Sequence, residues 1–454
     1  MPNFAQKHTK ITTFYLIEPA AFDLKPRLRV SSKWKKAVLV IPLLATEFTI
    51  EENRPVFENI VKQLKGVTYL SKIIFGLDRA TDDEALELAD ICKKYGLRNY
   101  LIQHNDGPGF SSIYKQLNNA GFNLDQPGKG KNMFMSFGIA QALGAQCVGL
   151  IDADIRTFNR HQLDRLLFPV IALNYDFSKA FYSRIANRRM YGRVKRLLLD
   201  PLLIALKRKF TESKEEKVLR LIDFLLAFHY QLSGEVAFDI NLLKRMHFAT
   251  NWGVEIFTLI EVYRKASNVA QVQFSLKPFD HKHQEVSPKD RQKGLHKMAI
   301  DIVTTLLSAL VVEEGIEISD HFIRDLTVTY LGVADELIKK YADNSAFSGL
   351  EYDRNEEEAM VRGVFKDALI FAGDLLTSPY RLTERFLRLL STHEVFRKYI
   401  DAGIAEDILK VEQETQSQLF ETPQTVSWER VVMKLPKIMY DIIDVLEEEK
   451  KLYE

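Results

Sequence analysis

Apolar runs alternate with segments of helical periodicity between residues 37 and 154. The runs are continuous and rich in β-branched residues, which predicts strands that are buried on both faces. The predicted strands cover residues 37–44, 70–78, 98–104 and 146–154, and the predicted helices between them cover residues 54–67, 81–96 and 131–145. Strands that alternate with helices predict an α/β fold, in which helices cover a parallel sheet. This pattern is typical of a Rossmann-like nucleotide-binding half.

The pattern changes after Asp154. Residues 160–232 hold helical patterns with many basic side chains, and from about residue 288 nearly every segment has helical period. The clearest examples are residues 296–315, 320–342 and 428–453. No fixed repeat of about 20–50 residues is visible, so we do not expect a solenoid. We expect a lead-in at 1–36, an α/β domain at 37–290 and a mostly α-helical C-terminal region at 291–454, whose apolar faces cover the α/β domain or pair two subunits in a homodimer.

Composition excludes several classes of protein. The 62 Lys and Arg residues balance 61 Asp and Glu residues, so no global charge attracts nucleic acid or an anionic membrane. Two cysteines, Cys92 and Cys147, form no disulfide framework or zinc ligand set, and a cytoplasmic location fits them. The first residues lack the apolar core of a signal peptide. No run reaches the roughly 20 apolar residues of a membrane span, so none is expected.

Two aspartates follow the last predicted strand. Asp152 and Asp154 come directly after the apolar run Val148–Ile151. Acidic side chains at the carboxyl end of a buried strand lie where open α/β sheets bind ligands. Their hard oxygen atoms suit Mg²⁺ or Mn²⁺, which leave open positions for phosphate oxygens. The alternative is an acidic loop that caps the next helix.

A lysine between two glycines precedes the predicted helix at 131–145. Lys129 is flanked by Gly128 and Gly130, so the backbone can approach a ligand closely and the lysine can meet an anion near a helix N-terminus. The spacing matches neither a Walker loop nor the GxGxxG pattern. The alternative is a surface turn before a helix.

Further polar side chains interrupt apolar segments later in the chain. Glu235 follows Gly234 in a turn, and Glu255 lies one turn into an otherwise apolar helix, with Glu261 on a nearby face. His281 and His283 alternate in an extended segment, so they face opposite sides and one of them can ligate a metal. For each residue the alternative is an ordinary solvent-facing position or turn.

A basic stretch within residues 177–203 could bind a small carboxylate or phosphate, because arginine pairs with such anions through two hydrogen bonds. Its members are Arg184, Arg188, Arg189, Arg193 and Lys195, interleaved with Tyr182 and Tyr191. The alternative is an amphipathic helix with a solvated basic face.

These motifs, taken in order, resemble the retaining GT-A glycosyltransferases. The closest likeness is to the glucosyl-3-phosphoglycerate synthase family, with a further likeness to mannosylglycerate synthase. The matching segments are PGKG (127–130), DAD (152–154), FYSR…GRVKRLL…PLL (181–203), GE (234–235), WGVEI (252–256) and HKH (281–283). The resemblance covers roughly residues 37–310, and it implies a GT-A (Rossmann-like) nucleotide-sugar-binding domain followed by the helical region.

The resemblance also implies roles for individual residues. Pro42, Leu43 and Glu47 would line the nucleobase and ribose pocket, with Asp78 nearby. Lys129 would contact the donor diphosphate or sugar, and Glu235 and Glu255 would fix the hydroxyls of the donor sugar. Asp152 and Asp154 would hold the cation, with His283 preferred over His281 as the third ligand. Gly192, Arg193 and Val194 would form the loop that accepts the acceptor's anionic group.

The implied reaction moves a hexose from a nucleoside-diphosphate sugar, UDP-glucose or GDP-glucose, to 3-phosphoglycerate or D-glycerate. It would retain the anomeric configuration and depend on Mg²⁺ or Mn²⁺. Three segments depart from the family pattern: LLATEF (43–48), GLDRATDDE (76–84) and Lys195 in the acceptor loop. Lys195 replaces a hydroxyl residue of the phosphoglycerate enzymes, which leaves glycerate or another small acid open as the acceptor.

Three alternatives are kept. The first is mannosyl transfer from GDP-mannose. The second is a nucleotidyltransferase, which would carry a GxGTR-like signature after the first strand where this chain has PLLATEF. The third is a catalytically silent GT-A-like protein that binds a nucleotide sugar or a protein partner.

Overall fold

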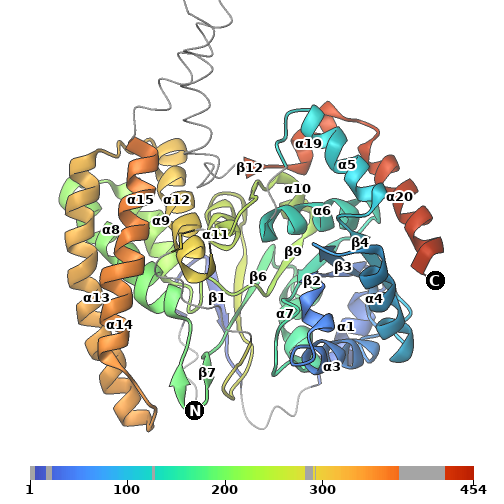
Figure 1. Cartoon of the computed structure of the whole chain (residues 1–454), viewed down its shortest axis with the longest axis horizontal. Coiled ribbons are helices and arrows are strands. Elements are labelled where there is room, and N and C mark those ends of the chain that lie inside the picture. Colours follow the sequence, from blue (N-terminus) through green and yellow to red (C-terminus); the bar gives the residue numbers. More distant parts are fainter. Residues whose placement is uncertain are drawn as a thin grey trace, which may run out of the picture.

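An eight-stranded sheet forms the centre of the computed structural model, which describes residues 6–16, 23–124, 128–281, 290–291, 293–377 and 425–453 (Figure 1). In spatial order the strands are β1 (Ile11–Phe14), β11 (Val269–Gln273), β6 (Phe177–Phe181), β9 (Val236–Asp239), β5 (Cys147–Leu150), β2 (Ala37–Leu44), β3 (Leu70–Asp78) and β4 (Tyr100–His104). Two short pairs lie outside this sheet: β7 (Ile185–Ala186) with β8 (Arg189–Met190), and β10 (Phe248–Ala249) with β12 (Thr425–Val426).

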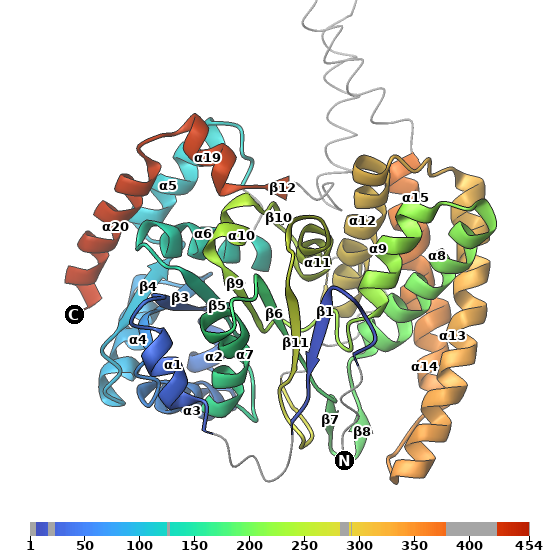
Figure 2. The ribbon, with the colours of Figure 1, turned by 180° about the vertical axis from the view of Figure 1, so that it is seen from behind.

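Helices cover the sheet and form a separate layer beside it (Figures 1 and 2). Around the sheet lie α1 (Lys25–Ser31), α2 (Thr46–Thr49), α3 (Arg54–Lys65), α4 (Asp82–Lys94), α5 (Pro108–Asn119), α6 (Lys129–Ala142), α7 (Arg160–Ala172), α10 (Ile240–Arg245) and α11 (Val254–Lys265). The layer next to the β1 edge contains the π-helical turns η1 (Val194–Leu199) and η2 (Val361–Phe365) and the helices α8 (Asp200–Ser213), α9 (Glu216–Leu226), α12 (Gly294–Glu314), α13 (Asp320–Ser348), α14 (Arg354–Met360) and α15 (Lys366–Thr377).

The central strands are buried on both faces, as their unbroken apolar runs predict. Along β2, Val38 and Val40 pack into one apolar cluster, whereas Leu39 and Ile41 pack into the cluster on the opposite face. Side chains of a strand alternate between the two faces, so an apolar residue is needed at every position. The expected α/β class with a helical C-terminal region is confirmed.

One strand of the sheet runs against the others. All neighbouring strands are parallel except β9, which is antiparallel to both β5 and β6. The parallel strands end at one edge of the sheet, and β9 begins at that same edge. We call it the carboxyl edge. The turn before β9 therefore lies beside the residues that follow β5 and β6, which brings distant parts of the chain together.

The last described segment returns to the sheet-containing half. Helices α19 (Trp428–Lys434) and α20 (Ile438–Tyr453) pack over α5, α6 and β4, far from the helical layer that precedes them (Figure 1). Trp428 stacks on Phe134 of α6 and donates a hydrogen bond to the Phe134 carbonyl over 2.6 Å. Strand β12 pairs with β10. Strand β1, which lies within the expected lead-in, also joins the sheet. Segments near both ends of the chain therefore contribute to the central half. The expected domain limits stay a prediction.

Several local expectations were wrong. Residues 177–203 carry helical period in the sequence, but their first five residues form β6 and the next part forms the β7–β8 hairpin before η1 begins. Their alternation of small, basic and aromatic residues obscured a buried strand. Helix α5 lies in a stretch for which we predicted no element. The single helix expected over residues 428–453 is wrong, because Pro436 interrupts it. The structure has two helices there, α19 and α20.

One described helix is long and apolar enough to qualify as a membrane span by length and composition alone, and the expectation that the chain has no span stays a prediction. The qualifying window is Gly294–Val312 in α12, and 72% of it is buried inside the protein. A core helix of a folded domain passes the same test, so the feature is weak evidence for a membrane.

Candidate active site

The carboxyl edge brings together acidic and basic side chains that are far apart in the sequence. Asp152 follows β5, Glu235 precedes β9, and Lys129 and Glu255 lie in the first turns of α6 and α11. The segment that contains His281 runs antiparallel to the residues after β5. These residues with Asp154 form the carboxyl-edge cluster: Lys129, Asp152, Asp154, Glu235, Glu255 and His281.

Lys129 lies at the centre of this cluster. Its Nζ atom is 2.7 Å from Oδ1 of Asp152 and 2.9 Å from Oε1 of Glu255. Burial alone would lower the pKa of the Lys129 ammonium, but the two carboxylates overcome this effect and raise the pKa above its ordinary value. The lysine therefore stays charged and holds together two carboxylates that would otherwise repel each other.

Gly234 allows Asp152 to approach the turn before β9. A Cβ atom at residue 234 would lie 2.2 Å from Oδ2 of Asp152, a distance that no side chain tolerates. The glycine of the GE motif is thus explained by close packing of an acidic side chain against the backbone. This contact fixes the position of Asp152 relative to Glu235.

Glu235 is fully buried and only partly paired. Tyr182 donates a hydrogen bond to its Oε2 atom over 2.8 Å. Its Oε1 atom has no hydrogen-bond partner among the described residues. Burial raises the pKa of this carboxyl group, and the nearby charge of Asp152 raises it further. A buried acceptor atom with an unused lone pair is suited to receive a hydroxyl group.

Asp154 and His281 are neighbours. The Nδ1 atom of His281 is 3.7 Å from Oδ1 of Asp154, and an isolated bridge joins Ile155 to His281. Burial opposes ionisation of Asp154, but His281 and more distant cations lower the pKa of its carboxyl group. Neither Asp154 Oδ1 nor His281 Nε2 has a hydrogen-bond partner within the part of the chain that the structure describes. His283, the preferred sequence prediction, lies outside the described residues, so its role stays a prediction.

The residues expected at the nucleobase pocket lie farther along the same edge. Pro42 and Leu43 pair in register with Gly76 and Leu77, so the end of β2 lies beside Asp78. Asn105 donates a hydrogen bond to Asp78 over 3.1 Å, and burial raises the pKa of the Asp78 carboxyl group. Glu47 lies in α2 directly after β2 and is partly exposed.

Comparison with known proteins identifies the family. No protein-family model matches the chain. The chain is 38% identical over 352 residues to the glucosyl-3-phosphoglycerate synthase of Persephonella marina, and the match covers 76% of this chain and 83% of the relative. The corresponding enzyme of Methanococcoides burtonii is 33% identical over 345 residues, covering 75% of this chain and 82% of the relative. The chain belongs to the glucosyl-3-phosphoglycerate synthase family. It is a glycosyltransferase, and the family resemblance seen in the sequence is confirmed.

Solved structures of similar proteins come from Mycobacterium tuberculosis. Its glucosyl-3-phosphoglycerate synthase in complex with Mn²⁺, UDP and glucosyl-3-phosphoglycerate matches with 23% identity and a TM-score of 0.46, over 65% of this chain and 86% of that chain. The same enzyme with Mg²⁺ and UDP matches with 23% identity and a TM-score of 0.46, over 65% of this chain and 85% of that chain.

The acceptor loop expected from the family resemblance is connected to the cluster through Tyr230 and Arg184. Gly192 has a φ of 73°, a left-handed conformation that favours glycine, and it packs against the Tyr230 hydroxyl. Burial opposes the charge on Arg184, but Tyr230, Tyr182 and Asp154 together raise the pKa of its guanidinium group. Arg193 and Val194 follow at the start of η1, and burial lowers the pKa of Arg193. Lys195 forms an ion pair with Asp200.

Lys179 was missed by the sequence interpretation. It lies on β6, its side chain is 1% exposed, and its Nζ atom donates a hydrogen bond to the Ser233 carbonyl over 2.6 Å. Burial lowers the pKa of Lys179 to about 8, while Glu255 and Glu235 oppose this shift. A lone lysine inside the strand sequence FSKAF was the available signal, but the helical assignment of this segment concealed it.

Glu261 serves a different purpose from Glu255. Its carboxylate accepts a hydrogen bond from the His247 backbone over 2.7 Å and pairs with Lys265 over 2.5 Å. It therefore ties α11 to the segment before β10 and is separate from the carboxyl-edge cluster.

Proposed function

We propose that this protein transfers glucose from a nucleoside-diphosphate glucose to 3-phosphoglycerate with retention of the anomeric configuration. The contact of Lys129 with both Asp152 and Glu255, beside the pair of Asp154 and His281, carries the proposal. The names of both curated relatives support glucose as the sugar and 3-phosphoglycerate as the acceptor. UDP-glucose is the first donor to test, because the mycobacterial enzyme binds it together with phosphoglyceric acid.

A divalent cation fits the residues present, and we propose that Asp152, Asp154 and His281 hold it. The supporting observation is the pair of buried atoms without hydrogen bonds, Asp154 Oδ1 and His281 Nε2. Carboxylate and imidazole donors suit Mn²⁺, and Mg²⁺ accepts the same carboxylates. When bound, such an ion supplies Lewis-acid stabilisation of the charge on a departing diphosphate. His283 remains an alternative third ligand.

The protein's own side chains supply positioning and charge. The Lys129 ammonium would give up part of its contact with Asp152 and bind a phosphate oxygen of the nucleotide sugar. This oxygen is negatively charged, like the carboxylate that it replaces. Glu235 and Glu255 would accept hydrogen bonds from sugar hydroxyls and so orient the anomeric carbon. Arg193 would bind the acceptor's anionic group.

The proposed chemistry needs no covalent intermediate. The acceptor hydroxyl would attack from the face that the diphosphate leaves, and the surrounding charges would stabilise the oxocarbenium-like transition state. The finer expectations, a cytoplasmic location and a homodimer that binds no nucleic acid, are part of this proposal. Size-exclusion chromatography with light scattering tests the oligomeric state.

One assay tests the reaction. Purified protein with Mg²⁺ or Mn²⁺ is incubated with UDP-glucose, GDP-glucose or GDP-mannose and with 3-phosphoglycerate or D-glycerate, and products are identified by mass. Glucosyl-3-phosphoglycerate is expected, and proton NMR of its anomeric signal reports retention. Exclusive transfer of mannose would contradict the glucose proposal. No product from any pair would favour a silent nucleotide-sugar-binding protein, which thermal shifts with UDP and Mn²⁺ would detect.

A further inference from the structure

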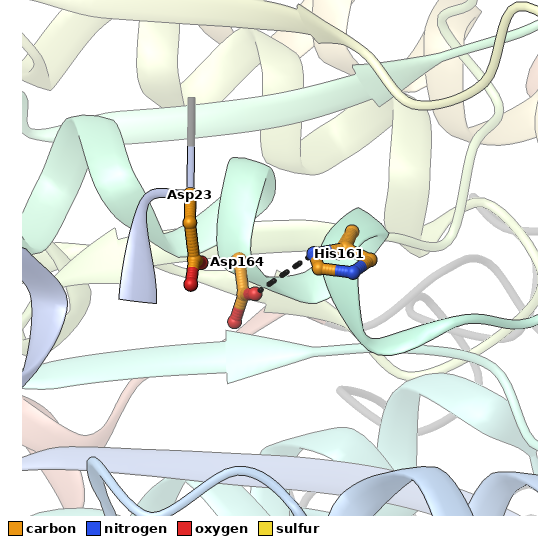
Figure 3. Close-up of side chains that lie close together, drawn as sticks. All are labelled: Asp23, His161 and Asp164. Carbon is orange, nitrogen blue, oxygen red and sulfur yellow. Dashed lines mark ion pairs between the residues drawn. The ribbon is translucent and has the colours of Figure 1, made fainter. Parts of the chain in front are cut away.

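A second group of metal-ligating side chains lies at the other end of the strands. Asp23 precedes α1, His161 lies in the first turn of α7, and Asp164 follows three residues later on the same helix (Figure 3). We call these three residues the α7 cluster. Tyr69, which directly precedes β3, donates a hydrogen bond to Asp164 over 2.7 Å. The α7 cluster is therefore at the amino-terminal edge of the sheet, opposite the carboxyl edge.

The side chains of the α7 cluster lie close together. One donor atom from each residue lies within 4.8 Å of the others, and Nδ1 of His161 is 3.6 Å from Oδ2 of Asp164 (Figure 3). The first turn of α7 is fixed by Asn159, whose side chain accepts a hydrogen bond from the His161 backbone. Positions three apart share a helix face, so His161 and Asp164 are held in register.

A buried oxygen atom without a hydrogen bond is a further sign of a ligand. Asp164 is only 2% exposed, and Tyr69 satisfies its Oδ1 atom, but its Oδ2 atom has no hydrogen-bond partner among the described residues. This oxygen is turned toward His161 in Figure 3, and Asp23 lies on the other side of Asp164. Buried carboxylate oxygens normally have a hydrogen-bond partner, so one that lacks it beside further ligand atoms is suited to a metal ion.

We infer that Asp23, His161 and Asp164 form a second metal site, which takes a divalent transition-metal ion of the zinc class. One imidazole nitrogen and two carboxylate oxygens match the ligand preference of Zn²⁺, with a remaining position open to water or an anion. Donors around a tetrahedral ion with bonds of about 2.1 Å lie about 3.4 Å apart. The donor atoms, which lie within 4.8 Å of one another, therefore have to approach by up to about 1.4 Å, which rotation of the two exposed side chains can supply.

Basic residues beside the cluster affect what completes the site. A cleft of about 600 Å³ adjoins Asp23 and contains Lys25, Arg29, Lys33 and Arg160. These cations reduce the attraction for a bare metal ion but favour an anionic ligand at its open position. We therefore expect phosphate to strengthen zinc binding, and the two conditions are compared in the test.

Zinc titration of the full-length Asp154→Asn protein tests the site, because this background weakens binding at the carboxyl edge. Calorimetry with Zn²⁺, with and without inorganic phosphate, should show one site per chain. Asp23→Asn and His161→Ala in the same background should each weaken that site at least tenfold. Both positions are exposed, so the fold is expected to survive, whereas Asp164→Asn risks the buried contact with Tyr69. His321→Ala, which removes an exposed histidine on α13, is the matched control.

Cobalt gives a second readout. The visible absorption of bound Co²⁺ should decrease in His161→Ala and remain in His321→Ala, because the band depends on the imidazole ligand. Zinc affinity that is equal in the Asp154→Asn protein and its His161→Ala derivative would overturn the inference, as would absence of zinc binding in the Asp154→Asn protein. Neither result depends on glucosyl transfer, so failure of this inference and failure of the proposed function are distinguishable.

Discussion

The carboxyl-edge cluster and the α7 cluster both contain aspartates and a histidine, but their surroundings differ. At the carboxyl edge, Lys129 pairs with Asp152 and Glu255 inside a buried network that several distant segments build. In the α7 cluster, two ligands share one helical turn and two of the three side chains are exposed. The comparison shows that ligand types alone do not define a catalytic site. The carboxyl-edge cluster differs from the α7 cluster in two respects. Its charges are buried and compensated by a lysine, and several other polar groups lie beside them.

The largest expected effect is a difference in transfer rate between variants of the two clusters. Asp154→Asn should lower the transfer rate by about 10²–10⁴-fold, because it would remove a proposed ligand of the cation that stabilises charge in the transition state. His161→Ala should leave the rate within about twofold, since the α7 cluster lies at the opposite sheet edge. Initial rates with saturating Mn²⁺ measure both. Near-normal transfer by Asp154→Asn would refute the metal assignment.

The next prediction concerns stability and the C-terminal helices α19 and α20, which pack on the sheet-containing half. Trp428→Ala should cost about 3–5 kcal/mol of unfolding free energy, because it empties a buried site against Phe134 and Gly138. Trp34, which is 83% exposed, provides the matched control, and Trp34→Ala should change stability by less than about 0.5 kcal/mol. Urea denaturation measures the unfolding free energy of both variants. If Trp428→Ala cost no more than Trp34→Ala, the C-terminal segment would contribute little to stability.

The next effect tests how tightly the carboxyl-edge cluster is positioned. Gly234→Ala places a methyl group against the Asp152 carboxylate and should lower the rate by about 10²-fold, as expected for a displacement near 1 Å. In Gly332→Ala the added methyl group meets no atom within 4 Å, and this change in α13 should slightly stabilise the helix without changing the rate. If Gly234→Ala kept full activity, close packing of Asp152 would be unimportant.

The smallest effect concerns the buried ammonium of Lys179. Deprotonation above its lowered pKa of about 8 would leave Glu235 and Glu255 less compensated, so the rate should fall about tenfold between pH 8 and pH 9.5. The unfolded chain holds this proton up to the ordinary lysine pKa of 10.5, so this group's contribution to stability increases with pH between these values. The decline would thus not reflect unfolding caused by Lys179.

Rates and tryptophan fluorescence recorded together from pH 6 to pH 10 measure this effect. Lys179→Met should already be slow at pH 7 and should lack the decline, with the KM for the acceptor unchanged. A wild-type rate that stays constant up to pH 10 would rule out a required Lys179 ammonium.

The sequence by itself determined the first half of the sheet. The strands predicted at 37–44 and 70–78 coincide with β2 and β3, because a strand buried on both faces leaves an unbroken apolar run. It also indicated Lys129, Asp152, Glu235 and Glu255, since each is a polar residue beside apolar positions or glycine. These signals are local, so they are readable without knowing which segments meet.

Only the tertiary structure decided which of these residues meet. The antiparallel entry of β9 brings Glu235 to Asp152, and the pairing of Ile155 with His281 brings the described histidine to Asp154. Lys179 became visible as a buried cation only once its segment proved to be a strand. The α7 cluster depends on contact between two segments that are more than a hundred residues apart. Such contacts arise from long-range packing, which no short window of sequence encodes.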